Sequence, residues 1–216
     1  MNTVIPTWEV MPTPSIWDKD GSITNWLWDS IKPLPPFMVA DGSQRASQQT
    51  TTRVCYDQTA LYIRYDCEDR DIWGTYTERD QPIYDEEVVE IFIGQGDDAP
   101  VRYFEFQVSP NNVLFDARIY NPTSQRTELQ VSHEWNCPRI RWAAQRHDDV
   151  HQWWAVLVIP WQGLDIFGPL PKIWRANFYR IERPRDADPE YSCWSPTMTS
   201  PADFHKPAYF GRLNLS

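Results

Sequence analysis

Residues 80–93 of this chain read DQPIYDEEVVEIFI, and this stretch decides the fold prediction. Its first half is a polar loop in which Tyr84 stands beside three consecutive acidic residues. Its second half is rich in Val, Ile and Phe, residue types that favour β-strands, and one carboxylate, Glu90, interrupts it. The stretch therefore predicts an acidic loop that leads directly into a strand with a polar group inside it.

Outside this stretch, many short segments alternate between apolar and polar residues, the period that β-strands show. The predicted strands are residues 50–57, 60–67, 87–94, 101–109, 113–120, 139–144, 152–159, 172–182 and 208–215. Residues 161–166 predict one short helical turn. Short strands without alternating helices predict an all-β fold, an antiparallel two-sheet β-sandwich of the immunoglobulin-like or jelly-roll-like kind.

The first 36 residues differ in composition from the rest of the chain. Prolines at 6, 12, 14, 33, 35 and 36 oppose regular strand pairing. Four tryptophans make the segment too apolar for a free tail; they are Trp8, Trp17, Trp26 and Trp28. We predict an irregular segment over residues 1–36 that packs on a sandwich formed by residues 37–216.

Charge and cysteine content narrow the function classes. The 216-residue chain carries a net charge of −10, which opposes binding to nucleic acid phosphates. No apolar run approaches the roughly 18 residues of a membrane span, and the N-terminus has no secretory signal pattern. The cytoplasm is therefore the default compartment, and the outside of the cell is the alternative if a leader has been removed.

The chain has four cysteines, and their spacing matches no metal-binding pattern. We expect all four to be reduced and buried: Cys55, Cys67, Cys137 and Cys193.

The predicted strands place polar and aromatic side chains on a common face, because side chains alternate along a strand. If residues 87–94, 101–109 and 113–120 are neighbouring strands, one surface presents Glu90, Tyr103, Glu105, Gln107, Arg118 and Tyr120. Rings and hydrogen-bonding groups together suit a sugar, which is apolar on its faces and polar around its edge. A solvated outer face with ion pairs between strands fits the same pattern, so periodicity alone leaves both interpretations open.

Together with C-terminal residues 194–197 (WSPT), 201–207 (PADFHKP) and 210–213 (FGRL), residues 80–93 make the chain resemble the family 9 carbohydrate-binding modules. The resemblance extends from about Asp41 to Leu213. Those modules are β-sandwiches that hold a sugar between two aromatic rings and normally accompany a glycoside hydrolase. The resemblance implies non-catalytic binding of a glucose- or xylose-type sugar, or of a plant or microbial polysaccharide.

The resemblance also assigns residues to the site. Tyr84 and Phe204 fall where the family has its two clamping tryptophans. Glu90 matches a glutamate that binds sugar hydroxyls, and Gln107 stands where the family has an arginine. Trp73, close before the acidic loop, is a further candidate platform for a sugar ring. The expected carbohydrate site comprises Tyr84, Phe204, Glu90, Gln107, Glu105 and Trp73.

Carbohydrate binding of this kind requires no cofactor, but structural calcium is a candidate. Carboxylates that could bind a hard cation are dense at Asp66, Glu68, Asp69, Asp71 and residues 85–87. Family 9 modules carry structural calcium, which favours this interpretation. No EF-hand loop is present, so solvated acidic loops are the alternative.

Two other functions stay open at the level of sequence. The fold could serve as a protein-interaction or structural module whose aromatic surface meets a protein partner. It could also be a small glycoside hydrolase that uses Glu90 and Glu105 as its carboxylate pair, since such enzymes place two carboxyl groups roughly 5 to 9 Å apart. A panel of sugars separates these functions, because only a sugar-binding protein responds to it without turnover.

Overall fold

The computed structural model describes residues 4–13 and 26–216. These residues form thirteen strands and short 3-10 turns, and they contain no α-helix. The strands are β1 (Thr7–Pro12), β2 (Met38–Val39), β3 (Thr50–Tyr56), β4 (Ala60–Glu68), β5 (Val88–Gln95), β6 (Arg102–Val108), β7 (Leu114–Tyr120), β8 (Gln130–Ser132), β9 (Arg141–His147), β10 (Gln152–Pro160), β11 (Ile173–Glu182), β12 (Glu190–Cys193) and β13 (Gly211–Leu215). The 3-10 turns are η2 (Trp26–Ser30), η3 (Ile83–Asp85), η4 (Arg126–Glu128), η5 (Asp148–Val150), η6 (Trp161–Leu164) and η7 (Pro207–Tyr209). The predicted all-β fold is confirmed.

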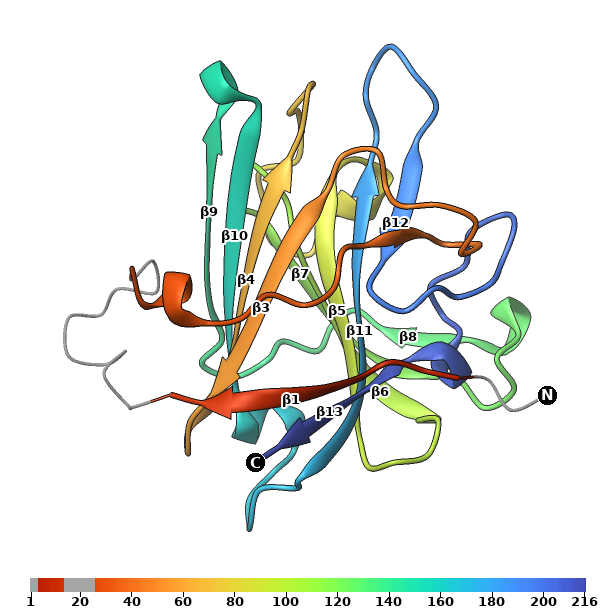
Figure 1. The fold of residues 1–216 in the computed structure, drawn as a ribbon. Helices are drawn as coiled ribbons and strands as arrows, with labels where there is room; N and C mark the ends of the chain where they lie inside the picture. Colours follow the sequence, from red (N-terminus) through yellow and green to blue (C-terminus); the bar gives the residue numbers. More distant parts are fainter. Residues whose placement is uncertain (1–3, 14–25) are drawn as a thin grey trace.

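The strands follow one long, curled path of hydrogen-bonded neighbours (Figure 1). Their order is β8-β7-β6-β5-β11-β13-β1-β3-β4-β10-β9, and β12 and β2 lie off this path beside β11. Strand β1 joins the two halves, because Thr7 to Val10 pair with β13 and Met11 and Pro12 pair with β3. Both pairings are parallel, so the prediction of a purely antiparallel sandwich is wrong at this strand. Parallel partners lie far apart along the chain and leave no hairpin pattern in the sequence.

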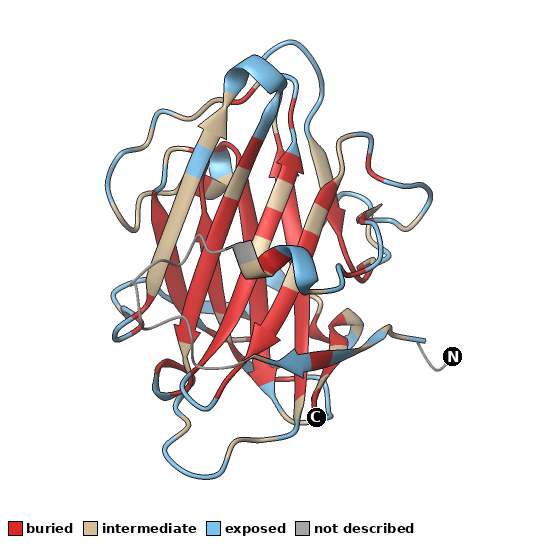
Figure 2. Cartoon of the chain, turned by 60° about the vertical axis from the view of Figure 1, so that its left-hand side comes forward, coloured by how far each residue is buried: buried red, intermediate tan, exposed pale blue. Residues whose placement is uncertain are grey.

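The main hydrophobic core lies between the two halves of this sheet. It combines side chains of β3, β4 and β10 with side chains of β5, β6, β7 and β11. Tyr65 on β4 reaches across the core: its hydroxyl donates to the Glu90 carbonyl at 2.8 Å, and its ring meets Phe178 edge-on. The central strands are buried along most of their length (Figure 2). The sandwich is thus confirmed as a fold, built from two facing halves of a continuous sheet.

The outer face of each half is covered as well. Over β3, β4 and β10, Trp28 of η2 packs into a small cluster with Tyr62 and Val156. Over β5, β6, β7 and β11, a larger cluster gathers around Phe92 and extends to Phe204 in the C-terminal loop. Because loops rather than a second sheet cover this outer face, it can form a pocket.

The N-terminal segment departs from the prediction. Thr7–Pro12 forms β1 instead of irregular chain, and Val10 within it is fully buried. Trp8 packs against the main core and Trp28 is buried. Trp17 lies outside the described residues. Five of the six prolines that opposed pairing lie outside this strand, and Pro12 ends it, which is why a strand fits there.

The nine predicted strands each overlap an observed one, with ends that differ by a few residues. The helical turn expected at residues 161–166 is the 3-10 turn η6. The strands that sequence analysis missed are β1, β2, β8 and β12. Most of these are short, so too few residues were available to show a period of two.

Candidate functional site

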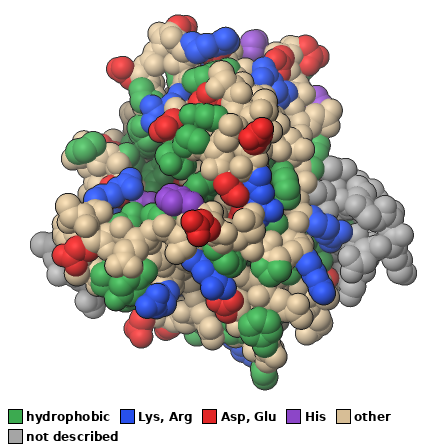
Figure 3. Space-filling model, turned by 180° about the vertical axis from the view of Figure 1, so that it is seen from behind, with side chains coloured by type: hydrophobic (Ala, Val, Ile, Leu, Met, Phe, Trp, Pro, Cys, Tyr) green, Lys and Arg blue, Asp and Glu red, His purple; other side chains and the backbone are tan. Residues whose placement is uncertain are grey.

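A pocket of about 420 Å³ opens on the outer face of β5 and β6. Seen from the side opposite to Figure 1, the surface shows a hollow with hydrophobic side chains around it and histidine and charged side chains close by (Figure 3). Five residues predicted for the carbohydrate site line the pocket: Tyr84, Glu90, Glu105, Gln107 and Phe204. The structure therefore brings together five of the six, although they come from three separate parts of the chain: residues 84–90, β6 and the C-terminal loop.

Strand register places the polar residues on the pocket face. Glu90 of β5 pairs with Gln107 of β6, and Phe92 pairs with Glu105. Paired residues point to the same face of a sheet, so Glu90, Gln107 and Glu105 share the outer face. They form its polar floor, with Phe92 between them.

The contribution of β7 to this face differs from the prediction. Glu105 pairs with Ala117, and Gln107 pairs with Phe115, so the apolar residues of β7 face the pocket. Arg118 and Tyr120 were predicted on the same surface as Glu90. They lie on the opposite face, so this prediction is wrong. Both faces of β7 are covered by other parts of the protein. The apolar character of one face therefore did not indicate which face of β7 packs against the main core.

Aromatic side chains form the walls of the pocket. Tyr84 lies on η3 and is half-buried, and its ring packs edge-on against Phe115 at a centroid distance of 5.5 Å. Phe204 is only 7% exposed, and its ring stacks on Tyr179 of β11 at 4.2 Å. Each ring is therefore held by a second ring from the sheet, which fixes its orientation before any ligand arrives.

Glu90 places a buried carboxyl group on the floor of the pocket. It is 2% exposed and lines the pocket, yet its carboxyl group forms no hydrogen bond or ion pair with any residue in the described part of the chain. Burial raises the pKa of this carboxyl well above its ordinary value, and the nearby Glu105 raises it further. A buried polar group without a partner is costly, so an outside partner is needed to satisfy it.

Glu105 and Gln107 extend this polar floor. The Gln107 side-chain nitrogen Nε2 donates to Glu105 Oε1 at 2.6 Å, while the other amide atom, Oε1, is buried without a partner. Burial raises the pKa of Glu105 to about 7, against the opposing effect of the hydrogen bond from Gln107. The floor thus offers a ligand two carboxyl groups and one free amide oxygen.

His205 closes one side of the pocket. Its Nδ1 lies 2.8 Å from the Tyr103 hydroxyl, and its Nε2 lies 3.9 Å from Glu105 Oε2. Burial lowers the pKa of His205 to about 3, and the nearby Arg126 adds to this effect. The imidazole is therefore neutral near pH 7 and supplies no positive charge to Glu105.

Two arginines at the pocket were not predicted. Arg126 of η4 pairs with Asp203 at 3.3 Å, and Arg183 donates from Nη2 to the Tyr191 hydroxyl at 2.7 Å. Arg183 Nε is buried without a partner. Neither arginine lies on a stretch with a recognisable period, so the sequence carried no signal for them.

Comparison with known proteins shows which family the chain belongs to. Residues 44–215 match the sequence profile of carbohydrate-binding family 9. The chain belongs to carbohydrate-binding family 9. A relative from Arthroderma benhamiae (strain ATCC MYA-4681 / CBS 112371), named "Extracellular protein", is 29% identical over 179 residues, which cover 79% of this chain and 80% of that protein.

Solved structures support the family 9 fold. A crystal structure of a candidate carbohydrate-binding protein from Bacteroides uniformis ATCC 8492 matches with a TM-score of 0.77 and 17% identity, over 98% of this chain and 99% of that one. A family 9 module from Caldicellulosiruptor kristjanssonii in complex with cellotriose matches with a TM-score of 0.66 and 15% identity, over 97% and 93% of the two chains. The same TM-score holds for that organism's family 9 module in complex with glucose, at 14% identity and over 97% and 95%.

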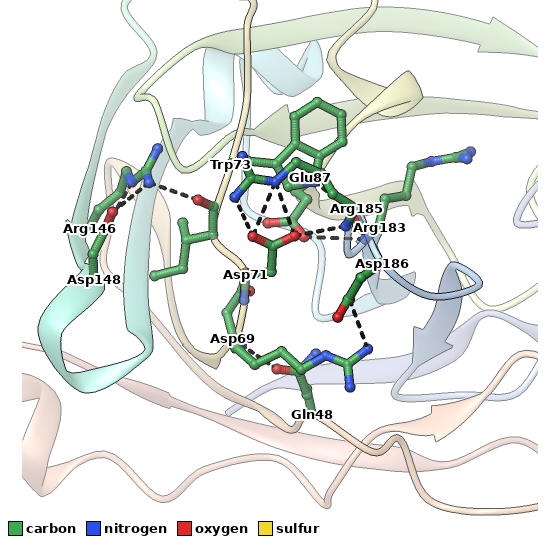
Figure 4. Close-up of polar contacts among 12 residues, drawn as sticks. Gln48, Asp69, Asp71, Trp73, Glu87, Arg146, Asp148, Arg183, Arg185 and Asp186 are labelled. Atoms are coloured by element: carbon green, nitrogen blue, oxygen red, sulfur yellow. Dashed lines mark hydrogen bonds and ion pairs between the residues drawn. The ribbon is translucent and has the colours of Figure 1, made fainter.

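The sixth predicted residue of this family 9 protein, Trp73, lies elsewhere. Its indole Nε1 donates to the Arg183 carbonyl at 2.5 Å, and it does not line the pocket. Figure 4 shows it beside Glu87 and the ion pair that joins Asp71 to Arg185. The indole donor is thus engaged within the protein, away from the pocket.

A second group of buried carboxylates lies beside Trp73. Asp69, Glu87 and Glu182 each bring one carboxylate oxygen within 4.8 Å of the other two. Asp69 and Glu87 are among the residues predicted for calcium, whereas Glu182, which ends β11, is not. The three residues are named the acidic triad below.

Arg180 is the cationic partner of the acidic triad. Its Nη2 lies 2.9 Å from Asp69 Oδ2, and the Trp153 indole donates to the same oxygen at 3.0 Å. Arg180 also donates to the Glu68 carbonyl at 2.5 Å. The side chains of Arg180 and Asp69 are fully buried, so this is an internal ion pair.

The acidic triad fits the structural calcium that the family implies. With all three carboxylates ionised, one guanidinium would leave an excess of negative charge, which a divalent cation bound here would balance. Glu87 Oε2 is buried without a partner, and burial raises the pKa of this carboxyl to about 9, with Asp69 contributing. Oxygen donors of this kind suit calcium.

Three of the other acidic residues predicted for calcium are engaged elsewhere. Asp66 pairs with Arg53 and Arg64, and Asp71 pairs with Arg185. Glu86 accepts from the Thr75 backbone nitrogen at 2.7 Å. These carboxylates fix loops and strand edges.

Proposed function

We propose that this family 9 protein binds a carbohydrate without converting it, in the pocket between Tyr84 and Phe204. The observation that carries the proposal is Glu90: a carboxyl group buried in the floor of a pocket, aimed at the space a ligand would fill, with no partner in the described chain. Protein interiors rarely leave such groups unsatisfied unless a ligand satisfies them.

The pocket matches a sugar in shape and chemistry. Its volume of about 420 Å³ falls in the usual range for small-molecule sites. Tyr84 and Phe204 offer flat apolar surfaces for the C–H faces of a sugar ring. Glu90, Glu105 and the free oxygen of Gln107 offer acceptors for its hydroxyl groups, and charged acceptors form the stronger hydrogen bonds.

A calorimetric titration with neutral sugars tests this proposal. The panel is glucose, xylose, cellobiose, xylobiose, cellotriose and soluble polysaccharides. We expect saturable binding to at least one of them, weakened roughly tenfold or more in Tyr84→Ala, since a central aromatic contact typically contributes more than about 1.4 kcal/mol.

Tyr120→Ala is the matched control. Tyr120 is also half-buried, with Arg102 over its ring at 4.2 Å, but it lies on the opposite face of the sheet. We expect this variant to bind as the parent does. Equal losses in both variants, or no response to any sugar at millimolar concentration, would overturn the proposal and favour a protein partner for the aromatic surface.

The same samples distinguish binding from hydrolysis. We expect cellotriose and xylobiose to remain intact after prolonged incubation, as measured by chromatography of the sugars. Turnover that is lost in both Glu90→Gln and Glu105→Gln would contradict non-catalytic binding.

We further propose that the acidic triad holds a structural calcium ion. Glu87 Oε2, which lacks a donor, is the oxygen that carries this proposal. Calcium should raise the midpoint of thermal unfolding of chelator-treated protein, because a ligand that binds only the folded state stabilises it. Glu87→Gln should abolish that rise. A midpoint that calcium leaves unchanged would sink the proposal.

A further inference from the structure

The two carboxyl groups in the pocket floor lack any cation at hydrogen-bonding distance. Glu90 is 2% exposed and Glu105 is 5% exposed, and neither forms an ion pair with an arginine or lysine among the described residues. His205, whose Nε2 lies 3.9 Å from Glu105 Oε2, is neutral near pH 7. The floor is therefore short of positive charge.

Neither arginine that lines the pocket forms an ion pair with the floor, although Arg126 lies close enough to oppose the rise that burial causes in the pKa of both Glu90 and Glu105. Arg126 pairs with Asp203, and Arg183 is hydrogen-bonded to Tyr191 and lies over its ring. The remaining charged or titratable groups of the lining are Asp85 on η3, His133 after β8 and the phenol groups of Tyr84 and Tyr191. The acidic side chains of the floor thus face the ligand space without an ion-pair partner among the described arginines and lysines.

Aromatic rings surround the same space. Tyr84, Phe92, Phe115 and Phe204 all line the pocket, and Phe92 lies between Glu90 and Glu105 in the sheet register. Ring faces attract cations through their negative quadrupole. Two carboxyl groups without an ion-pair partner, inside a ring of aromatic side chains, form a site for an ammonium group.

We propose that the preferred ligand of this pocket is an amino sugar, a sugar whose ammonium group lies between Glu90 and Glu105. This inference rests on the proposed carbohydrate-binding function and names its ligand class. The aromatic walls hold the ring faces, and the ammonium group donates charge-assisted hydrogen bonds to both carboxylates. Gln107 Oε1, which is buried without a partner, accepts from a neighbouring hydroxyl.

Proton linkage is a consequence of this arrangement. The raised pKa values of Glu90 and Glu105 arise from burial without a cation. An ammonium group beside them favours the ionised carboxylates, so binding an amino sugar releases protons. A neutral sugar has no charge of its own to drive this release as strongly.

Three trisaccharides that differ only in one substituent on each sugar unit test the inference. They are the β-1,4-linked trimers of glucose, of glucosamine and of N-acetylglucosamine, titrated calorimetrically just below neutral pH. We expect the glucosamine trimer to bind at least about tenfold more tightly than cellotriose, the factor that one charge-assisted hydrogen bond supplies. Acetylation removes the charge, so the N-acetylglucosamine trimer should lose this advantage.

Two variants assign the preference to the floor. Glu90→Gln and Glu105→Gln keep side-chain size and hydrogen-bonding capacity but remove the negative charge. Each should bring the glucosamine trimer to within about threefold of cellotriose, and each should reduce the protons released, as measured in buffers of different ionisation enthalpy. Asp98→Gln, at an exposed acidic residue outside the pocket, should leave the preference unchanged.

The outcomes separate this inference from the proposed function. If cellotriose binds and the glucosamine trimer binds no more tightly, the amino-sugar inference is wrong and carbohydrate binding stands. If no sugar of either panel binds, both fail. If Asp98→Gln reduces the preference as much as the pocket variants do, the effect belongs to the overall charge of the protein, which also contradicts the inference.

Discussion

Two groups of buried carboxylates flank the start of β5, and their surroundings are opposite. The acidic triad at Glu87 contains an internal cation, Arg180, which is fully buried against Asp69. The pocket floor at Glu90 contains none, and its carboxyl groups face a cavity. A buried charged group with an ion-pair partner in the protein has a structural role. A buried carboxyl group that faces a cavity without such a partner is instead available to bind a ligand.

The largest effect is expected from breaking the internal ion pair. Arg180→Met leaves Asp69 as an unpaired buried charge and should lower the free energy of unfolding by about 3–5 kcal/mol. Urea unfolding measures this loss. If the acidic triad is structural and the pocket floor binds the ligand, Arg180→Met should leave sugar affinity unchanged under conditions in which the variant is folded.

Arg185→Met is the control for that change. Arg185 pairs with Asp71, but its side chain is exposed, so the loss should be at most about 1 kcal/mol. Equal losses in the two variants would mean that burial of the Arg180 pair does not matter, and the comparison would fail.

The pH dependence of stability sharpens the comparison. Burial raises the pKa of Glu105 to about 7 and that of Glu87 to about 9, both from 4.5. The folded chain therefore holds these protons more tightly than the unfolded chain does. The free energy of unfolding should be highest below pH 4.5 as far as these groups decide it, and should fall as the pH rises to about 7 for Glu105 and to about 9 for Glu87.

Single variants divide that pH range between the two sites. In calcium-free buffer, Glu105→Gln should flatten the lower part of the decline and Glu87→Gln the part above neutral pH. Urea unfolding at a series of pH values measures both slopes. A decline that neither variant alters would show that these carboxyl groups do not titrate as their burial implies.

The smallest effect is expected at Trp73. Trp73→Phe keeps the apolar ring but removes the indole donor to the Arg183 carbonyl, which should lower stability by about 1 kcal/mol. Sugar affinity should not change, because Trp73 does not line the pocket. A loss of affinity larger than the change produced by Tyr84→Ala would restore Trp73 as a sugar platform.

The sequence predicted the pocket floor because period-two alternation is a local property. Glu105 and Gln107 are two residues apart on one strand, so their common face followed directly. Glu90 and Tyr84 belong to one short stretch, and the family resemblance added Phe204. The strand positions were predictable for the same reason.

Features set by pairing between distant strands could not be predicted. Which face of β7 meets the pocket depends on its register with β6, where Ala117 lies opposite Glu105. Glu182 joins Asp69 and Glu87 only because β11 pairs with β5. The parallel pairing of β1 likewise depends on β13 at the other end of the chain.

Glu90→Leu, measured for both affinity and stability, tests the central claim most directly. Leucine has a similar size but cannot hydrogen-bond, and the carboxyl group it replaces has no partner among the described residues. We expect sugar binding to weaken by about tenfold or more, while the free energy of unfolding measured in urea stays the same or rises. Unchanged affinity, or a loss of stability comparable to that of Arg180→Met, would show that Glu90 is a structural residue and not the group that meets the sugar.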